Sequence, residues 1–133
     1  MGPGDEEQDG RRGLNGARIL VVEDEYHLAE DLADALRSGG AVVVGPVGSL
    51  GQAEEPLASG RLDGAVLDMN LRGEPGFALA ERLQADDVPF VIVSGYSSEA
   101  IPHSLSQVPR LEKPIDSRDA VKALAQLLAA RTG

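Results

Sequence analysis

Short runs of branched aliphatic residues alternate with longer amphipathic stretches from Ala17 onward. Short apolar runs are typical of strands that are buried on both faces, and apolar residues repeated every three or four positions are typical of helices packed against them. The pattern predicts strands at residues 18–23, 41–44, 64–67, 90–93 and 110–112. This alternation predicts an α/β fold in which a parallel sheet is covered by helices on both faces.

Helical patterns follow most of these strands, and most of the predicted helices have a start or stop signal. Ser49, with Gln52 three residues later, resembles a capping box, and Pro56 keeps that helix short or bent. Asp116 caps the last helix, with Asp119 as its capping partner. Three helices have apolar residues on their predicted buried faces: Leu28, Leu32 and Leu36, ending at Gly39-Gly40; Phe77, Ala80 and Leu83; and Val121, Leu124 and Leu128.

The start of the chain and one internal stretch are less regular. Residues 97–107 contain Pro102 and are followed by Pro109, so any helix there has at most a couple of turns. Residues 1–16 are rich in Gly, Asp and Glu and have almost no apolar side chains, which predicts a flexible acidic tail. The remainder, residues 17–133, is long enough for one domain with its own core.

Composition and charge exclude several classes of partner. The formal net charge is −10, and Lys and Arg form no cluster, which argues against a nucleic-acid or anionic-membrane surface. There is no cysteine, which suits a reducing cytoplasm. The apolar runs are far shorter than the roughly 20 residues that span a bilayer, and no signal-peptide core is present. We therefore expect a cytoplasmic protein without membrane or nucleic-acid partners.

Polar side chains stand where four of the predicted strands end. Glu23 and Asp24 follow the first strand, Asp68 the third, Ser94 the fourth and Lys113 the fifth. In an open parallel sheet, ligands bind beyond the carboxyl ends of the strands. We therefore expect these side chains to converge at one rim of the sheet.

Three carboxylates at one rim imply a bound cation or raised pKa values. Two carboxylates about 4 Å apart repel each other by roughly 4 kcal/mol at an effective dielectric constant of about 20. Carboxylate oxygens and a backbone carbonyl suit Mg²⁺, and Asn70 is the natural carbonyl donor. Asp68 can then accept a phosphoryl group as a nucleophile, while Mg²⁺, Lys113 and Ser94 each take one phosphoryl oxygen.

Each of these motifs also has an ordinary structural explanation. Glu23-Asp24 can cap a helix, Ser94-Gly95 can be a loop, and Lys113-Pro114 can be a turn. Their joint occurrence, in turn after strands one, three, four and five, is what favours a functional site.

Taken together, the motifs resemble the receiver domain of two-component response regulators. The resemblance rests on Val-Val-Glu23-Asp24, Val-Leu-Asp68-Met-Asn70, Val-Ser94-Gly and Glu-Lys113-Pro114, in the family's order and at similar spacing. It covers the chain from Ala17 to the last helix and implies a doubly wound sheet of order 2-1-3-4-5. It also implies that Glu23, Asp24, Asp68 and the Asn70 carbonyl bind Mg²⁺, that Asp68 is the phosphoacceptor, that Ser94 is the switch hydroxyl and that Lys113 contacts the phosphoryl group.

The chain departs from the family pattern at the switch. Arg110 falls near the position of the usual aromatic switch residue, and the segment between Ser94 and Lys113 is about one helical turn shorter than usual. Phe-Val-Ile-Val-Ser-Gly-Tyr, residues 90–96, is instead similar to the Phe-Ala-Thr-Gly-Tyr signature of a subgroup of single-domain receivers. Our hypothesis is that Tyr96 replaces the missing aromatic, and unchanged phosphorylation-dependent binding in Tyr96→Ala would exclude it.

The resemblance implies a phosphorylation-dependent binding module rather than an enzyme with an external substrate. A histidine kinase or histidine phosphotransfer protein would donate the phosphoryl group, and a downstream protein would read the modified surface. Because no further domain follows Gly133, we expect the signal to leave by protein contact or by onward phosphoryl transfer. Two alternatives are an aspartyl-phosphate phosphatase, which normally has a second acid where Asn70 stands, and a pseudo-receiver, against which the intact acids and Lys113 weigh.

Overall fold

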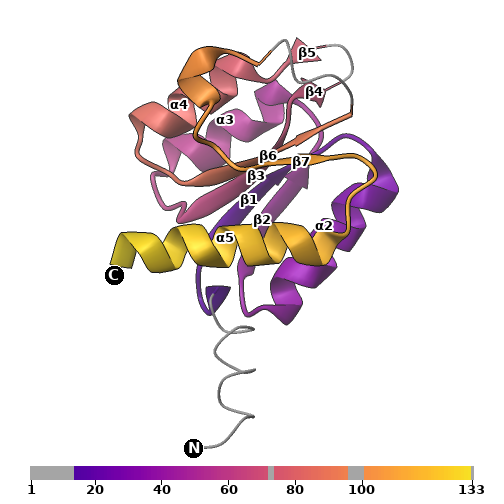
Figure 1. Ribbon diagram of the computed structural model, residues 1–133, viewed down its shortest axis with the longest axis vertical. Coiled ribbons are helices and arrows are strands. Elements are labelled where there is room, and N and C mark those ends of the chain that lie inside the picture. Colours follow the sequence, from indigo (N-terminus) through magenta and orange to yellow (C-terminus); the bar gives the residue numbers. More distant parts are fainter. Residues whose placement is uncertain (1–13, 72–73, 96–100, 133) are drawn as a thin grey trace, which may run out of the picture.

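A five-stranded parallel sheet forms the centre of the computed structural model, which describes residues 14–71, 74–95 and 101–132 (Figure 1). Its strands stand in the order β2-β1-β3-β6-β7, which is the expected order 2-1-3-4-5 when the parallel strands are counted along the chain. The bounds are β1 Arg18–Val22, β2 Val42–Val47, β3 Gly64–Asp68, β6 Phe90–Ser94 and β7 Arg110–Glu112. The predicted fold class is confirmed.

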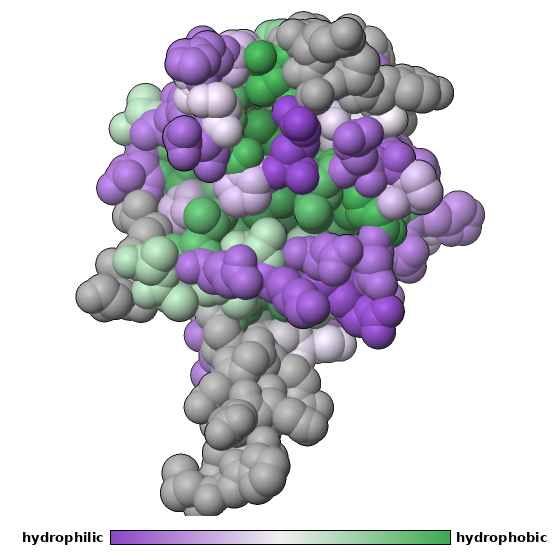
Figure 2. Space-filling view, viewed as in Figure 1, coloured by the Kyte–Doolittle hydropathy of each residue, from purple (hydrophilic) through white to green (hydrophobic). Residues whose placement is uncertain are grey.

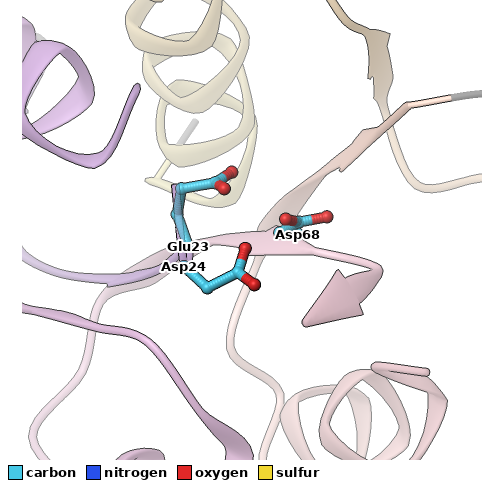
Figure 3. Close-up of side chains that lie close together, drawn as sticks. All are labelled: Glu23, Asp24 and Asp68. Atoms are coloured by element: carbon cyan, nitrogen blue, oxygen red, sulfur yellow. The ribbon is translucent and has the colours of Figure 1, made fainter. Parts of the chain in front are cut away.

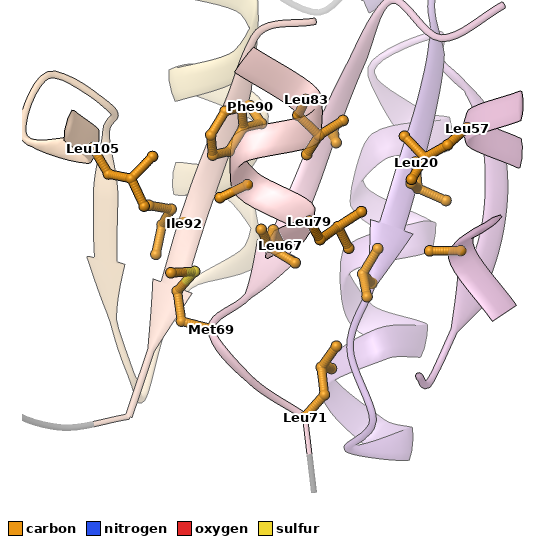
Figure 4. Packing of buried hydrophobic residues seen from close by; sticks show 14 residues of the cluster. Leu20, Leu57, Leu67, Met69, Leu71, Leu79, Leu83, Phe90, Ile92 and Leu105 are labelled. Atoms are coloured by element: carbon orange, nitrogen blue, oxygen red, sulfur yellow. The ribbon is translucent and has the colours of Figure 1, made fainter. Parts of the chain in front are cut away.

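Two helices cover each face of the sheet (Figure 1). Helices α2 (Tyr26–Ser38) and α5 (Ser117–Thr132) pack on one face, and α3 (Leu50–Ala58) and α4 (Phe77–Ala85) pack on the other. Strand β1 supplies both layers, because Ile19 and Val21 face α2 and α5 while Leu20 and Val22 face α3 and α4. Figure 4 shows the α3–α4 layer, which is built almost entirely from aliphatic side chains. None of the helices in the described part of the chain has the length and apolar character needed to cross a membrane.

The helix signals are largely confirmed, with two corrections. The Ser49 hydroxyl accepts a hydrogen bond from the Gln52 N–H at 3.1 Å, but the Gln52 side chain accepts from the Gly48 N–H at 2.8 Å instead of returning to Ser49. Asp116 accepts from the Arg118 N–H at 2.9 Å, as expected of a cap. In α4, Leu79 is buried with Ala80 and Leu83, whereas Phe77 is only half-buried.

Two segments differ from the expectation, and a third agrees with it. Strand β2 continues through Gly45-Pro46 to Val47, which an edge strand tolerates because the proline faces no further strand. A short antiparallel hairpin, β4 (Asn70–Leu71) with β5 (Glu74–Pro75), links β3 to α4 and was not predicted. Between β6 and β7 the described residues form a single 3-10 turn, His103–Leu105, which agrees with the proline-limited prediction.

The packed domain begins before Ala17. Leu14 is fully buried against the layer of α2 and α5, and the Gly16 N–H donates a hydrogen bond to the Gly40 carbonyl at 2.8 Å. A single leucine in a polar segment forms no periodic pattern, and the composition of the segment therefore predicts a tail that includes Leu14. Residues 1–13 of that predicted tail lie outside the described residues.

Candidate functional site

Three carboxylates meet at the carboxyl end of the sheet (Figure 3). Glu23 and Asp24 directly follow β1, and Asp68 is the last residue of β3. These strands are hydrogen-bonded neighbours in which Val22 pairs with Leu67, so the residues that follow stand side by side. Carboxylate oxygens of the three residues lie within 4.8 Å of one another. The convergence predicted from the strand ends is therefore present.

Lys113 lies between two of these carboxylates. Its ammonium is 3.3 Å from Asp68 Oδ2 and 3.4 Å from Glu23 Oε2. The Lys113 N–H donates to the Ser94 carbonyl at 2.8 Å, which fixes the start of the side chain beside the end of β6. Its proximity to Asp68 was expected, but its contact with Glu23 was not, because no sequence spacing shows which of several acids a long side chain reaches.

Burial makes the Glu23 carboxyl group an unusually weak acid. The residue is 3% exposed, and this burial is the main reason that its pKa is raised to about 7. The Glu25 N–H, which donates to Glu23 Oε2 at 3.0 Å, and the charge of Lys113 oppose the rise, whereas the charge of Asp68 adds to it. For Lys113, burial lowers the pKa, but the charges of Asp68 and Glu23 more than offset this and leave the pKa raised. The raised pKa expected of the acid cluster is therefore present at Glu23, but burial contributes more to it than the charge of the neighbouring Asp68.

Two buried oxygens at this rim have no hydrogen-bond partner among the described residues, namely Glu23 Oε1 and Ser94 Oγ. Asp68 is 1% exposed and Ser94 is 7% exposed, so water screens neither side chain well. Buried polar atoms are normally paired, and an orphaned carboxylate oxygen beside two further carboxylates is a donor set suited to a hard cation. The residues present therefore fit a divalent metal ion.

The loop after β3 holds Asp68 in place. Asn70 is exposed, and its N–H donates to Asp68 Oδ1 at 3.0 Å. Gly76 packs against the end of β3. Its N–H donates a hydrogen bond to the Met69 carbonyl, and a Cβ atom on Gly76 would lie 3.1 Å from the Asp68 carbonyl oxygen. No local signal in the sequence marked the contact of Gly76 with Asp68. Tyr96, the predicted switch residue, lies outside the described residues.

Comparison with known proteins agrees with this geometry. Residues 19–125 match the family model described as the response regulator receiver domain. The sensor protein TorS of Escherichia coli (strain K12) is 32% identical over 95 residues, which cover 71% of this chain but only 10% of TorS. The chain thus spans about a tenth of the length of that curated relative.

Solved structures of proteins of similar length also resemble this chain. A response regulator receiver protein from Sinorhizobium medicae WSM419 is 32% identical, with a TM-score of 0.75, over 87% of this chain and 97% of that one. The BeF3-activated conformation of SdrG from Pseudomonas melonis Fr1 is 41% identical, with a TM-score of 0.68, over 84% of this chain and 95% of that one. With most of the chain matched by the family model, this protein belongs to the response regulator receiver domain family of two-component signalling.

Proposed function

We propose that this protein is a phosphoacceptor whose Asp68 receives a phosphoryl group from the phosphohistidine of a histidine kinase or a histidine phosphotransfer protein. The observation that carries the proposal is the setting of the Asp68 carboxylate. It is buried, held by the Asn70 N–H on one oxygen and by Lys113 on the other, with Glu23 and Asp24 beside it. A carboxylate in this position is oriented for attack and is paired with a cation that can neutralise a transferred group.

The transfer forms one bond and breaks another. An Asp68 carboxylate oxygen attacks phosphorus, the oxygen–phosphorus bond forms, and the nitrogen–phosphorus bond of the donor breaks with its electron pair left on the imidazole, which takes up a proton. Lys113, already 3.3 Å from Asp68 Oδ2, is placed to neutralise the phosphoryl oxygens. The Ser94 hydroxyl, which has no hydrogen-bond partner among the described residues, would donate a hydrogen bond to another of these oxygens.

Glu23, Asp24, Asp68 and the backbone carbonyl of Asn70 would hold Mg²⁺. When bound, the ion supplies positive charge to the phosphoryl oxygens during transfer. The bound ion would also offset the free-energy cost of burying an ionised Glu23, because a cation favours the charged form of this side chain.

The phosphorylated protein would act by changing its binding to a downstream protein in the cytoplasm. Ser94 and Tyr96 would form the switch, consistent with the single-domain Phe-Ala-Thr-Gly-Tyr subgroup. The 41% identical SdrG, solved in a BeF3-activated conformation, supports an activation step of this kind. The phosphoryl group would leave by hydrolysis of the protein's own acyl phosphate, and no external substrate would be turned over.

Intact-mass measurement with a small phosphodonor and Mg²⁺ tests the proposal. The wild-type protein should gain one phosphoryl group, and Asp68→Asn should gain none. Asp34→Asn is the matched control, because Asp34 is an exposed carboxylate on α2 whose side chain is 73% exposed. It should be phosphorylated like the wild type.

Two outcomes would overturn the proposal. Equal phosphorylation of Asp68→Asn would show that another residue is the acceptor. Steady hydrolysis of unrelated phosphate esters, lost in Asp68→Asn, would identify a phosphatase. A parallel titration with Mg²⁺, followed by backbone amide shifts of Asp24 and Asn70, tests the metal site separately, and Asp24→Asn should weaken it.

A further inference from the structure

A fully buried leucine stands in the segment that follows Asp68, which is otherwise poor in apolar residues. Of residues 70–76, Leu71 is the only one with a large aliphatic or aromatic side chain, and it is 0% exposed. Large apolar side chains are rare on the described surface: those of Tyr26 and Val42 are exposed, and on the face drawn in Figure 2 hydrophilic side chains cover most of helix α5. The burial of Leu71 therefore ties a largely polar segment to the interior.

The Leu71 side chain belongs to the α3–α4 layer of the core, together with Leu67 of β3 and Leu79 of α4. Figure 4 shows Leu71 at the end of this layer, directed from the connection after β3 towards the rest of the layer. A leucine in a close-packed layer has little freedom to move, because neighbouring atoms occupy the space around it. The position of Leu71 is therefore set by the core.

Strand geometry passes this position on to Asn70. The two residues form β4, in which Leu71 is buried and Asn70 is exposed, because successive side chains of a strand point to opposite sides. The Asn70 carbonyl belongs to the planar peptide unit that joins Asn70 to Leu71. A fixed Leu71 Cα therefore fixes one end of the peptide plane that carries the expected metal-binding carbonyl.

Backbone hydrogen bonds hold the other end of this segment. The Asn70 N–H donates to Asp68 Oδ1 at 3.0 Å, and the Met69 N–H donates to the Val93 carbonyl at 3.0 Å, which extends the pairing of β3 with β6. The Met69 carbonyl accepts from the Gly76 N–H at 2.9 Å, which closes the segment. The hairpin between these bonds has strands of only two residues. Hairpins are marginally stable by themselves, so this one depends on an anchor in the core.

We propose that Leu71 is a positioning residue for Asn70 and, through Asn70, for Asp68. Its burial keeps the Asn70 N–H on the Asp68 carboxylate and holds the Asn70 carbonyl in a fixed direction. Leu71 acts through Asn70 and not by touching the metal ion or the phosphoryl group. The inference rests on the proposed function, in which Asp68 is the phosphoacceptor and Asn70 helps to hold Mg²⁺.

Mg²⁺ titration of the full chain, without a phosphodonor, tests this role. Leu71→Ala removes the anchor of the hairpin. Its dissociation constant for Mg²⁺, followed by the amide shift of Asp24, should rise about tenfold, as is usual when a group that orients a metal ligand is removed. Leu71→Met keeps a long apolar side chain of similar volume and should bring the constant back to within about twofold of the wild-type value.

Leu83→Ala is the matched control. Leu83 is also a leucine of the α3–α4 layer with 0% exposure, but it lies near the end of α4, which runs away from the carboxylate cluster. Leu83→Ala and Leu71→Ala remove the same atoms from the same layer, so both should be destabilised in urea. The Mg²⁺ dissociation constant of Leu83→Ala should nevertheless stay within about twofold of the wild-type value.

Hydrogen exchange of the Asn70 amide in the metal-free protein gives a second readout. This N–H is bonded to Asp68, so its exchange requires the segment to open. Leu71→Ala should speed the exchange, whereas Leu83→Ala should leave it near the wild-type rate. If Leu71→Ala does not fold, Leu71→Val, which removes one methylene group, should shift both readouts in the same direction by a smaller amount.

Two results would overturn the inference. Equal weakening of Mg²⁺ binding by Leu71→Ala and Leu83→Ala would make Leu71 an ordinary core residue. An Asn70 exchange rate that Leu71→Ala leaves unchanged would show that the backbone hydrogen bonds hold Asn70 without the anchor.

Failure of the proposed function is distinguishable from failure of this inference, because neither readout uses phosphorylation. A wild-type protein that gains no phosphoryl group would refute the proposed function, and the titration and the exchange rates would still decide the role of Leu71. A wild-type protein that binds no Mg²⁺ would refute the metal site, and the exchange rates would then decide whether Leu71 positions Asn70 against Asp68.

Discussion

The raised pKa of Glu23 predicts that the metal-free protein loses stability as the pH rises from about 5 to 8. In the unfolded chain this carboxyl group ionises near its ordinary pKa of 4.5, whereas in the folded protein it stays protonated until the pH approaches about 7. Between these values the unfolded state releases a proton that the folded state retains. Raising the pH therefore favours unfolding, and the penalty is complete once both states are ionised.

The size of this effect follows from the shift. From 4.5 to about 7 is about 2.5 pH units, and each unit corresponds to about 1.4 kcal/mol, so the penalty approaches about 3 to 4 kcal/mol above pH 7. Glu23→Gln cannot ionise and therefore escapes it. Relative to the wild type, the variant should become more stable by about 2 to 3 kcal/mol between pH 5 and pH 8.

Urea unfolding at several pH values, without divalent ions, measures the difference. Groups that do not interact with Glu23 titrate alike in both proteins and cancel in the comparison. Glu55→Gln, which removes an exposed carboxylate on α3, is the control, and its free energy of unfolding should change with pH in parallel with that of the wild type. Added Mg²⁺ should stabilise the wild type most at high pH, where Glu23 is ionised and available to the ion.

A Glu23→Gln profile that stays parallel to the wild type across this range would refute the reasoning. It would mean that Glu23 is already ionised in the folded protein at pH 5, so that Lys113 and the Glu25 N–H outweigh the cost of burial.

Three further changes test the parts of the fold that support the site. Gly76→Ala should destabilise the protein by about 1–3 kcal/mol and slow phosphorylation of Asp68, because the new Cβ would lie 3.1 Å from the Asp68 carbonyl oxygen. Gly51→Ala in α3, where a Cβ would meet Ser49 Oγ only at 4.0 Å, should be neutral or stabilising in the same thermal melts. Leu14→Ala should lower the free energy of unfolding by about 2–5 kcal/mol in urea, whereas a negligible loss would show that Leu14 is not part of the core. Ser49→Ala should cost about 1 kcal/mol through loss of the cap on α3, and Ser49→Thr should recover most of it.

Much of the fold was predictable because its signals are local. Buried strands need continuous apolar runs and helices need an apolar face, and both constraints can be read over a few residues. The local prediction failed where the structural role of a residue depends on its neighbours in the folded protein. Pro46 belongs to a strand only because β2 is at the edge of the sheet, and Leu14 is buried only because α2 and α5 provide a surface for it.

The site shows the same division. The sequence alone determined which polar residues end which strands. Glu23, Asp24, Asp68 and Ser94 come at the ends of apolar runs, and Lys113 follows the short last strand. Tertiary structure decided that Lys113 reaches Glu23 as well as Asp68, that Gly76 closes against Asp68, and that Leu71 is buried in the α3–α4 layer. Such contacts join residues that are far apart in the chain. They depend on side-chain length, direction and burial, which no spacing along the sequence encodes.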